Sequence, residues 1–258
     1  MMKVTIIGAG PGAPDLITVR GLKRLQEAEV VLYADSLVSD ELIAEAKSGA
    51  EIVKTAGMHL EEMVELMAAR CHEGKKVVRV HTGDPAVYGA ILEQIALLRE
   101  AGVEVEIIPG VSSVFASAAA VGAELTVPDL TQTVILTRAE GRTPVPDGEK
   151  LKDLASHGCT VALFLSATLT KKVVREFLNA GWSEETPVAV VYKATWPDQK
   201  VVRSTLKNLD EDMRKNGIRK QAMILAGWAL DEQIYEKNYR SKLYDKEFTH
   251  GFRRGAPK

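Results

Sequence analysis

Three small residues near the start of the chain have a spacing that is typical of dinucleotide binding. Gly8, Gly10 and Ala13 follow a short hydrophobic run as G-x-G-x-x-A, a pattern in which the first N–H groups of a helix bind a pyrophosphate. Asp35 ends the next hydrophobic run, where such folds place an acid for a ribose hydroxyl. Binding of NAD is therefore the first chemistry that these residue types suggest.

Two prolines argue against that chemistry. Pro11 lies inside the glycine motif and has no N–H to offer a phosphate. Gly10 and Ala13 each precede a proline, which disfavours helical backbone angles at both positions. We therefore predict that the helix begins later, at Pro14 and Asp15, where a proline and an acid suit a first turn. A stiff loop replaces the dinucleotide cradle, and an NAD(P)-dependent oxidoreductase stays an alternative from a different class.

Two further glycine turns follow hydrophobic runs. In the string TGDPAVYG we expect Asp84 to cap a helix that begins at Pro85. The string PGVSS has the same build, with a helix expected to begin near Val111 or Ser112. Each turn by itself is typical of a plain capped loop. The carboxyl ends of parallel strands share one edge of a sheet, so three such loops together predict a ligand-binding edge.

The other polar residues form no catalytic or metal-binding motif in the sequence. The five histidines lack metal-ligand spacing, and the sequence has no G-x-S-x-G, Walker or H-E-x-x-H motif. Asp35, Asp84 and Glu140 are candidate acids, but nothing in the sequence pairs them. We interpret Lys172 and Arg175 as part of a solvated helix face. The catalytic residue is left unknown, and no metal ligand is predicted.

The bulk composition is that of an ordinary folded protein. The 258 residues are 46% hydrophobic and 26% charged, and the net charge of -2 offers no basic surplus for nucleic acid. No apolar stretch reaches the roughly 18 residues of a membrane span, and the chain does not open with a signal-peptide pattern. We therefore expect neither nucleic acid nor membrane as a partner. Cys71 and Cys159 lie far apart, which disfavours a disulfide framework and predicts a cytoplasmic setting.

Strand-like and helix-like segments alternate along most of the chain. Short runs rich in Val and Ile occupy residues 4–7, 29–34, 51–55, 75–81 and 103–109. The alternation predicts an α/β domain over residues 1–122 with a mainly parallel, doubly wound sheet. It restarts after a break, which predicts a second α/β domain over residues 126–231 and a basic, aromatic tail over residues 232–258. The expected fold class is α/β, with two domains and mainly parallel or mixed sheets.

Three motifs, in this order, make the chain resemble one known family. GAGPGAPDLIT, TGDPAVYG and PGVSS look like motifs of the tetrapyrrole (corrin and sirohaem) methyltransferases, which transfer methyl groups from S-adenosylmethionine to ring carbons. The likeness covers nearly the whole chain. Four longer strings are similar to the precorrin-4 C11-methyltransferases, with an overall likeness to the cobalt-precorrin-4 enzymes of the anaerobic cobalamin route: KTAGMHLEEM, TQTVILTRAEGRTPVP, YKATWPDQ and GIRKQAMILAGWAL.

The resemblance implies a cleft between two α/β domains that holds S-adenosylmethionine, which leaves as S-adenosylhomocysteine. Motif by motif, it implies cofactor binding by Pro11, Thr82, Gly83, Asp84, Val87, Ser112, Ser113, Leu165, Ala194 and Ala222. It also implies a homodimer and a cobalt-carrying tetrapyrrole substrate with many carboxylates. Lys193 and Arg142 are the predicted substrate-binding residues, because both lie in distinctive loops at predicted strand ends.

The reaction implied by the resemblance is a direct displacement, in which ring carbon C11 attacks the sulfonium methyl group. Because the donor is already activated, the main tasks of the protein are alignment and exclusion of water. Alternatives within the family are methylation of metal-free precorrin-4, of another ring position, or of a protein as in diphthine synthesis. A non-catalytic tetrapyrrole carrier with the same fold is a further alternative.

Overall fold

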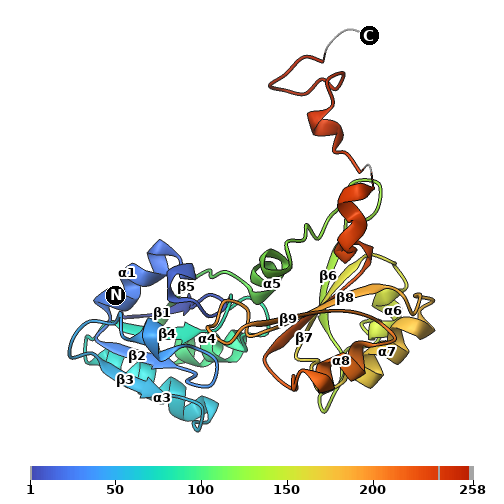
Figure 1. Ribbon diagram of the computed structural model, residues 1–258. Helices are drawn as coiled ribbons and strands as arrows, with labels where there is room; N and C mark the ends of the chain where they lie inside the picture. The colour runs from blue at the N-terminus through green and yellow to red at the C-terminus, as the bar shows by residue number, and fades with distance from the viewer. Residues whose placement is uncertain (1, 238, 256–258) are drawn as a thin grey trace. The chain divides into compact units, whose positions relative to one another are not determined.

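The computed structural model describes residues 2–237 and 239–255, which form two compact units (Figure 1). The first unit contains the described residues up to Ala116 together with Lys193–Asp198, and the second contains the other described residues. The division falls inside helix α5, Ser113–Val121. A short loop from the second half of the chain therefore belongs to the first unit.

The first unit is built on a five-stranded sheet in which every pair of neighbouring strands is parallel. Its strands are β1 Lys3–Gly8, β2 Val30–Tyr33, β3 Glu51–Lys54, β4 Val77–His81 and β5 Glu104–Ile108. Their order across the sheet is β3-β2-β4-β1-β5. The predicted parallel sheet is confirmed, and the carboxyl ends of β4, β1 and β5 are neighbours at one edge.

Helices cover both faces of this sheet (Figure 1). The helices are α1 Val19–Glu27, α2 Asp40–Ile43, α3 Leu60–His72 and α4 Ile91–Glu100. On one face, Ile7 and Val80 pack with Leu25 of α1. On the other, Ile6 packs with Met67 of α3, in the same cluster as residues of α4. Because successive strand residues point to opposite faces, the buried strands of a doubly wound sheet are apolar throughout.

The first α-helix begins later than the prolines predict. Pro14–Leu16 forms a single 3-10 turn, η1, and α1 begins only at Val19. Ile17 and Thr18 between them are extended, and the Thr18 hydroxyl accepts a hydrogen bond from the Gly21 N–H at 3.1 Å. A helical turn thus begins at Pro14 as predicted, but it is a single 3-10 turn, and the α-helix itself begins at Val19 after the Thr18 cap.

The helix expected from Pro85 is also wrong. Residues 85–88 form a turn, and α4 begins at Ile91. Tyr88 and Ala90 have φ angles of 55° and 48°, which belong to the left-handed region and end any right-handed helix. Asp84 therefore does not cap an α-helix, and its side chain has the different partners described below.

The second unit contains a mixed sheet of order β6-β7-β10-β8-β9. Its strands are β6 Val134–Arg138, β7 Thr160–Phe164, β8 Pro187–Tyr192, β9 Lys200–Thr205 and β10 Ala222–Ala226, with helices α6 Leu151–Ala155, α7 Thr170–Asn179 and α8 Leu209–Lys215. Only β6 and β7 pair in parallel, and the other neighbours are antiparallel. Leu163, Phe177 and Ile224 are fully buried in its core. The expected combination of parallel and mixed sheets in two α/β units is confirmed.

Three further 3-10 turns follow β10: η2 Trp228–Leu230, η3 Glu232–Glu236 and η4 Lys242–Tyr244. Among the described residues, none of the helices has the length and apolar character that a membrane crossing requires.

Candidate functional site

The three glycine-containing loops meet at the carboxyl edge of the first sheet, as the sequence predicts. A Cβ at Gly8 would lie 2.6 Å from both the Gly110 Cα and the Gly83 carbonyl oxygen. A Cβ at Gly110 would lie 2.1 Å from the same oxygen. Since real Cβ atoms do not approach other atoms so closely, only glycine allows these three backbones to pack together.

The backbone of the first loop is occupied by pairing with the second. The Gly10 N–H donates to the Gly83 carbonyl at 3.2 Å, and the Gly83 N–H donates to the Gly10 carbonyl at 2.8 Å. In the dinucleotide pattern the N–H groups of this loop bind a pyrophosphate at a helix start, but here α1 begins nine positions after Gly10. The geometry therefore argues against the NAD(P) alternative.

The Asp84 carboxylate joins the second loop to the third. One oxygen accepts the Ala86 N–H at 2.8 Å, and the other accepts the Gly110 N–H at 2.9 Å. Each carboxylate oxygen therefore accepts a hydrogen bond from the backbone. One of these bonds closes the turn after Asp84, and the other links the ends of two strands. Asp84 thus fixes the second and third loops relative to each other. Its position after a strand in the sequence did not predict this role.

Gly83 differs from the other two glycines because a Cβ there would make only ordinary van der Waals contacts. The nearest atoms to a Cβ at this position would be the Ser112 Cα and the Ser113 nitrogen, both at 3.9 Å. Its φ of 60° also favours glycine. Thr82 is exposed, Val87 is half-buried and Ser112 is buried. Thr82 therefore presents the exposed side chain of this loop.

The loop Lys193–Asp198 packs against the first glycine loop. The Trp196 indole N–H donates to the Pro11 carbonyl at 3.0 Å, and the Ala13 N–H donates to the Thr195 hydroxyl at 2.9 Å. A Cβ at Gly12 would lie 2.2 Å from the indole ring. Sequence reasoning did not select Thr195 or Trp196, although the indole N–H is a donor that needs an acceptor when it is half-buried.

Lys193 and Ala194 occupy the same loop. The Lys193 ammonium lies 2.7 Å from an Asp198 carboxylate oxygen and 5.3 Å from the centre of the Trp196 ring. The Lys193 ammonium, which we predicted to bind a substrate carboxylate, therefore already has an ion pair and a cation–π contact within its own loop. The φ angles of 46° at Lys193 and 70° at Thr195 are strained for non-glycine residues, and such strain is concentrated at functional sites.

The predicted site residues divide between the two units. The first unit contains Pro11, Thr82, Gly83, Asp84, Val87, Ser112, Ser113, Lys193 and Ala194, and the second contains Arg142, Leu165 and Ala222. Leu165 directly follows β7, has a φ of 51° and leaves 71% of its surface exposed. Ala222 begins β10 and pairs with Tyr192 at the end of β8. The left-handed backbone of Leu165 costs conformational free energy, and the residue still leaves its apolar side chain exposed.

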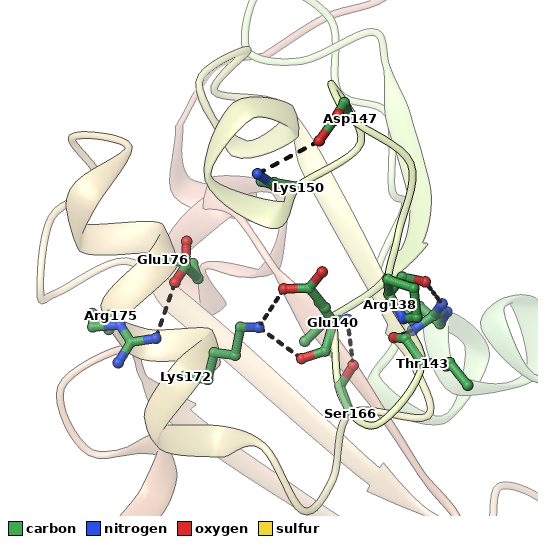
Figure 2. A network of polar contacts seen from close by, with 11 residues as sticks. Arg138, Glu140, Thr143, Asp147, Lys150, Ser166, Lys172, Arg175 and Glu176 are labelled. Atoms are coloured by element: carbon green, nitrogen blue, oxygen red, sulfur yellow. Dashed lines mark hydrogen bonds and ion pairs between the residues drawn. The ribbon is translucent and has the colours of Figure 1, made fainter.

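Figure 2 shows side chains that contact the loop after β6, which includes Glu140 and Thr143; Arg142 belongs to this loop by its place in the sequence. The Arg138 guanidinium donates to the Thr143 and Pro144 carbonyls. Lys172 of α7 donates to the Glu140 carbonyl at 2.8 Å and lies 3.1 Å from its carboxylate. The Lys172 hydrogen bond lowers the pKa of Glu140, which keeps this candidate acid ionised. Arg142 is exposed, and none of the ion pairs among the described residues includes it.

A buried polar cluster lies just before the second loop. Arg79 and His81 of β4 and Gln94 of α4 are 5%, 8% and 3% exposed. Within the part of the chain that the structure describes, the Arg79 Nε, His81 Nε2 and Gln94 Oε1 atoms have no hydrogen-bond partner. The Gln94 amide donates to the Ala90 carbonyl at 3.1 Å. Burial first, and then the Arg79 charge, lower the pKa of His81 to about 4, so this imidazole is neutral near pH 7.

The described residues contain no group of three His, Cys, Asp or Glu side chains that could hold a metal ion. The polar groups of the edge are backbone amides, hydroxyls and a carboxylate that the backbone already engages. Such a site can align and enclose a ligand, but it presents no activated nucleophile.

Comparison with known proteins identifies the family. The family model of the tetrapyrrole (corrin/porphyrin) methylases matches residues 3–210. The chain belongs to this family. It is 76% identical over 255 residues to the cobalt-precorrin-4 C(11)-methyltransferase of Priestia megaterium, covering 99% of each chain. The predicted family and the methyltransferase class are confirmed.

Two solved structures show how far the tetrapyrrole methylase fold extends. A cobalt precorrin-4 methyltransferase, described as a cobalamin biosynthetic enzyme, matches with a TM-score of 0.88 and 76% identity, covering 89% of this chain and 96% of that chain. The uroporphyrin-III C-methyltransferase of Thermus thermophilus, complexed with S-adenosylhomocysteine, matches with a TM-score of 0.73 and 29% identity, covering 88% and 93%. This methylase fold therefore includes most of both units.

The packing of the three loops makes a direct prediction for stability. Gly110→Ala should destabilise the protein by about 2 kcal/mol or more, because its Cβ would overlap the Gly83 carbonyl. Gly57→Ala is the matched control, since a Cβ there would meet no atom within 4 Å. Urea denaturation monitored by circular dichroism measures both. Equal denaturation midpoints for the two variants would contradict the close approach of the loops.

The lowered pKa of His81 predicts a loss of stability in acid. The unfolded chain binds a proton near the ordinary histidine pKa of 6.5, whereas the native imidazole binds it only near pH 4. Stability should therefore fall as the pH drops from 6.5 towards 4, by up to roughly 3 kcal/mol. Denaturation of His81→Gln across this range should show a smaller fall. The exposed His157→Gln is the control, and a fall in His81→Gln equal to that of the unchanged protein would rule out this origin.

Proposed function

We propose that the chain transfers a methyl group from S-adenosylmethionine to C11 of cobalt-precorrin-4, in the anaerobic route to cobalamin. The observation that carries this proposal is the likeness over 99% of the chain to a cobalt-precorrin-4 C(11)-methyltransferase. The complex of a more distant methylase with S-adenosylhomocysteine supports the same cofactor here. The cobalt is part of the substrate, and no resident metal is proposed.

The loop edge of the first unit fits the cofactor. The cofactor is proposed to contact the second loop at Thr82 and Gly83, with Val87 and the Ser112–Ser113 turn beside it, since Thr82 is exposed there. Pro11 and Ala194 belong to the two loops that Trp196 joins. Leu165 and Ala222 of the second unit complete the proposed set. Asp84 is proposed to act by holding the second and third loops together rather than by reacting.

The chain's residues are proposed to align the reactants and exclude water. S-adenosylmethionine supplies an activated methyl group, so no protein nucleophile is needed. In the first unit, the glycine edge is proposed to provide a surface against which the cofactor is aligned. Alignment of this kind lowers the barrier by converting an encounter into an intramolecular step. The proton released by the ring carbon has no acceptor among the residues assigned here.

Lys193 and Arg142 are proposed to bind carboxylates of the tetrapyrrole. Arg142 is exposed, so its guanidinium can meet a carboxylate in a two-pronged geometry. Lys193 already pairs with Asp198, and a substrate carboxylate would share or replace that partner. We also propose a homodimer and a cytoplasmic setting. Both cysteines are buried and reduced, and burial raises the pKa of each thiol.

Turnover with purified intermediates tests the function. The protein should convert cobalt-precorrin-4 and S-adenosylmethionine into a product heavier by one methyl group, with that methyl located at C11 by carbon-13 labelling. Metal-free precorrin-4 should react more slowly. S-adenosylhomocysteine at about 100 times its dissociation constant should stabilise the protein by about 2.7 kcal/mol in thermal unfolding, whereas NADH should not. Methylation at another position would contradict the proposed C11 specificity. Ligand binding without turnover would instead favour a non-catalytic carrier.

The contact of Trp196 with Pro11 predicts an effect on cofactor affinity. Trp196→Phe keeps a ring over Gly12 but removes one hydrogen bond, so S-adenosylhomocysteine should bind roughly three- to tenfold more weakly by calorimetry. Trp182→Phe is the matched control, because it loses an equivalent bond to the Ala155 carbonyl in the second unit. If both variants bind the ligand as the unchanged protein does, the loop Lys193–Asp198 does not position the cofactor edge.

A further inference from the structure

The last 22 residues have a charge unlike that of the rest of the chain. Residues 237–258, here the basic segment, contain seven Lys or Arg and two Asp or Glu. The other 236 residues contain 26 basic and 33 acidic ones. The chain therefore combines a body of net charge -7 with a segment of net charge +5. The family match ends at residue 210, so it assigns no role to this segment.

The described part of the basic segment has an internal organisation of its own. The Arg253 guanidinium donates to the Leu243 carbonyl at 2.8 Å and to the Asp245 carbonyl at 2.6 Å. His250 and Arg253 exchange backbone hydrogen bonds, and the His250 ring lies 6.5 Å from that of Phe252. One arginine is therefore used to close a small folded loop on itself.

Four other cations of the basic segment are exposed, whereas Lys237 pairs with Asp231. Arg240, Lys242, Lys246 and Arg254 are exposed, and no ion pair among the described residues includes any of them. Elsewhere in the chain some neighbouring cations share acidic partners, as where Lys75 and Arg70 meet Glu73. Unpaired cations next to one another repel, and they are favoured where an anionic ligand binds.

Large aromatic surfaces lie among these cations. Tyr244 is 80% exposed, and Phe252 is fully exposed at 101%. Exposed aromatic groups of this size are uncommon on a folded surface and mark places where a flat or apolar partner packs. The basic segment thus offers cations and aromatic faces together, a combination that suits a flat, conjugated polyanion.

We propose that the basic segment is an arm that captures the polycarboxylate tetrapyrrole and raises its local concentration. This inference rests on the proposed function. A body of net charge -7 repels a substrate with many carboxylates, and a segment of net charge +5 reverses that field locally. At an ionic strength of about 0.15 M such attraction acts over roughly 8 Å, so the arm works before the substrate reaches its final position. The exposed rings of Tyr244 and Phe252 stack on the macrocycle.

Single-stranded nucleic acid is the other class of partner that such a surface can bind. The acidic body argues against it, since a nucleic acid longer than the arm would also meet the net negative charge of the other 236 residues. A compact tetrapyrrole is small enough to contact the arm alone. The tetrapyrrole is therefore the partner that the charge distribution favours.

The test removes charge without removing structure. Lys242→Gln, Lys246→Gln and Arg254→Gln are combined in one variant, which leaves the Arg253 contacts in place. The matched control combines Lys23→Gln, Lys47→Gln and Lys152→Gln, three exposed lysines outside the segment. At about 20 mM salt, kcat/KM for cobalt-precorrin-4 should fall roughly three- to tenfold in the arm variant and less than twofold in the control. The change should lie in KM, and it should vanish at about 0.5 M salt.

Binding of uroporphyrin, a stable polycarboxylate porphyrin, gives a readout that does not depend on turnover. Its fluorescence titration should show the same salt-sensitive loss in the arm variant, while S-adenosylhomocysteine affinity stays unchanged. Arm-dependent uroporphyrin binding without any methylation of cobalt-precorrin-4 would support the arm and sink the proposed function. Turnover and porphyrin binding equal to those of the control would overturn the arm, as would a loss confined to binding of a single-stranded RNA.

Discussion

The contact on which the candidate site depends is the meeting of three backbones at Gly8, Gly83 and Gly110. A Cβ atom on Gly8 or Gly110 would collide with the Gly83 carbonyl oxygen and with the other glycine of the pair. Because the backbones touch, the Asp84 carboxylate can reach the Gly110 N–H, and the Gly10 and Gly83 amides can pair. The loops therefore behave as one rigid edge rather than as three independent turns, and a rigid edge can hold a ligand in a single orientation.

That edge consists almost entirely of backbone and small side chains, which suits the chemistry of the family. A methyl donor carries its own activation, so a methylase gains more from shape than from a reactive group. Several polar atoms near the edge are engaged within the fold, such as the Thr195 hydroxyl and the Pro11 carbonyl. Strained residues such as Thr195 and Leu165 mark where the fold accepts a local cost to hold a surface in place.

Electrostatics act on two scales in this molecule. At short range, a charged Arg79 and a neutral His81 are buried directly before the second loop, and burial keeps the histidine pKa low. At long range, an acidic body carries a basic, aromatic segment in which Arg240, Lys242, Lys246 and Arg254 are exposed. The short-range effect decides how firmly the edge is held in acid. The long-range effect decides which ligands approach the protein at all.

The amino-acid sequence by itself determined the strands, the fold class and the family, because these follow from local patterns: apolar runs of strand length, glycines after them, and long distinctive strings. It also placed Pro11 correctly as an obstacle to a dinucleotide helix. It predicted a helical start at Pro14, where only a 3-10 turn forms before the threonine cap of α1. It misplaced the helix start at Pro85, since Tyr88 and Ala90 adopt left-handed backbone angles. Only the tertiary structure decided that Asp84 ties loops together, that Asp198 offsets Lys193 and that Trp196 braces the first loop. Some of these contacts join residues that are far apart in the chain, and the others depend on the conformation of a loop. The spacing of residue types along the sequence predicts neither kind of contact.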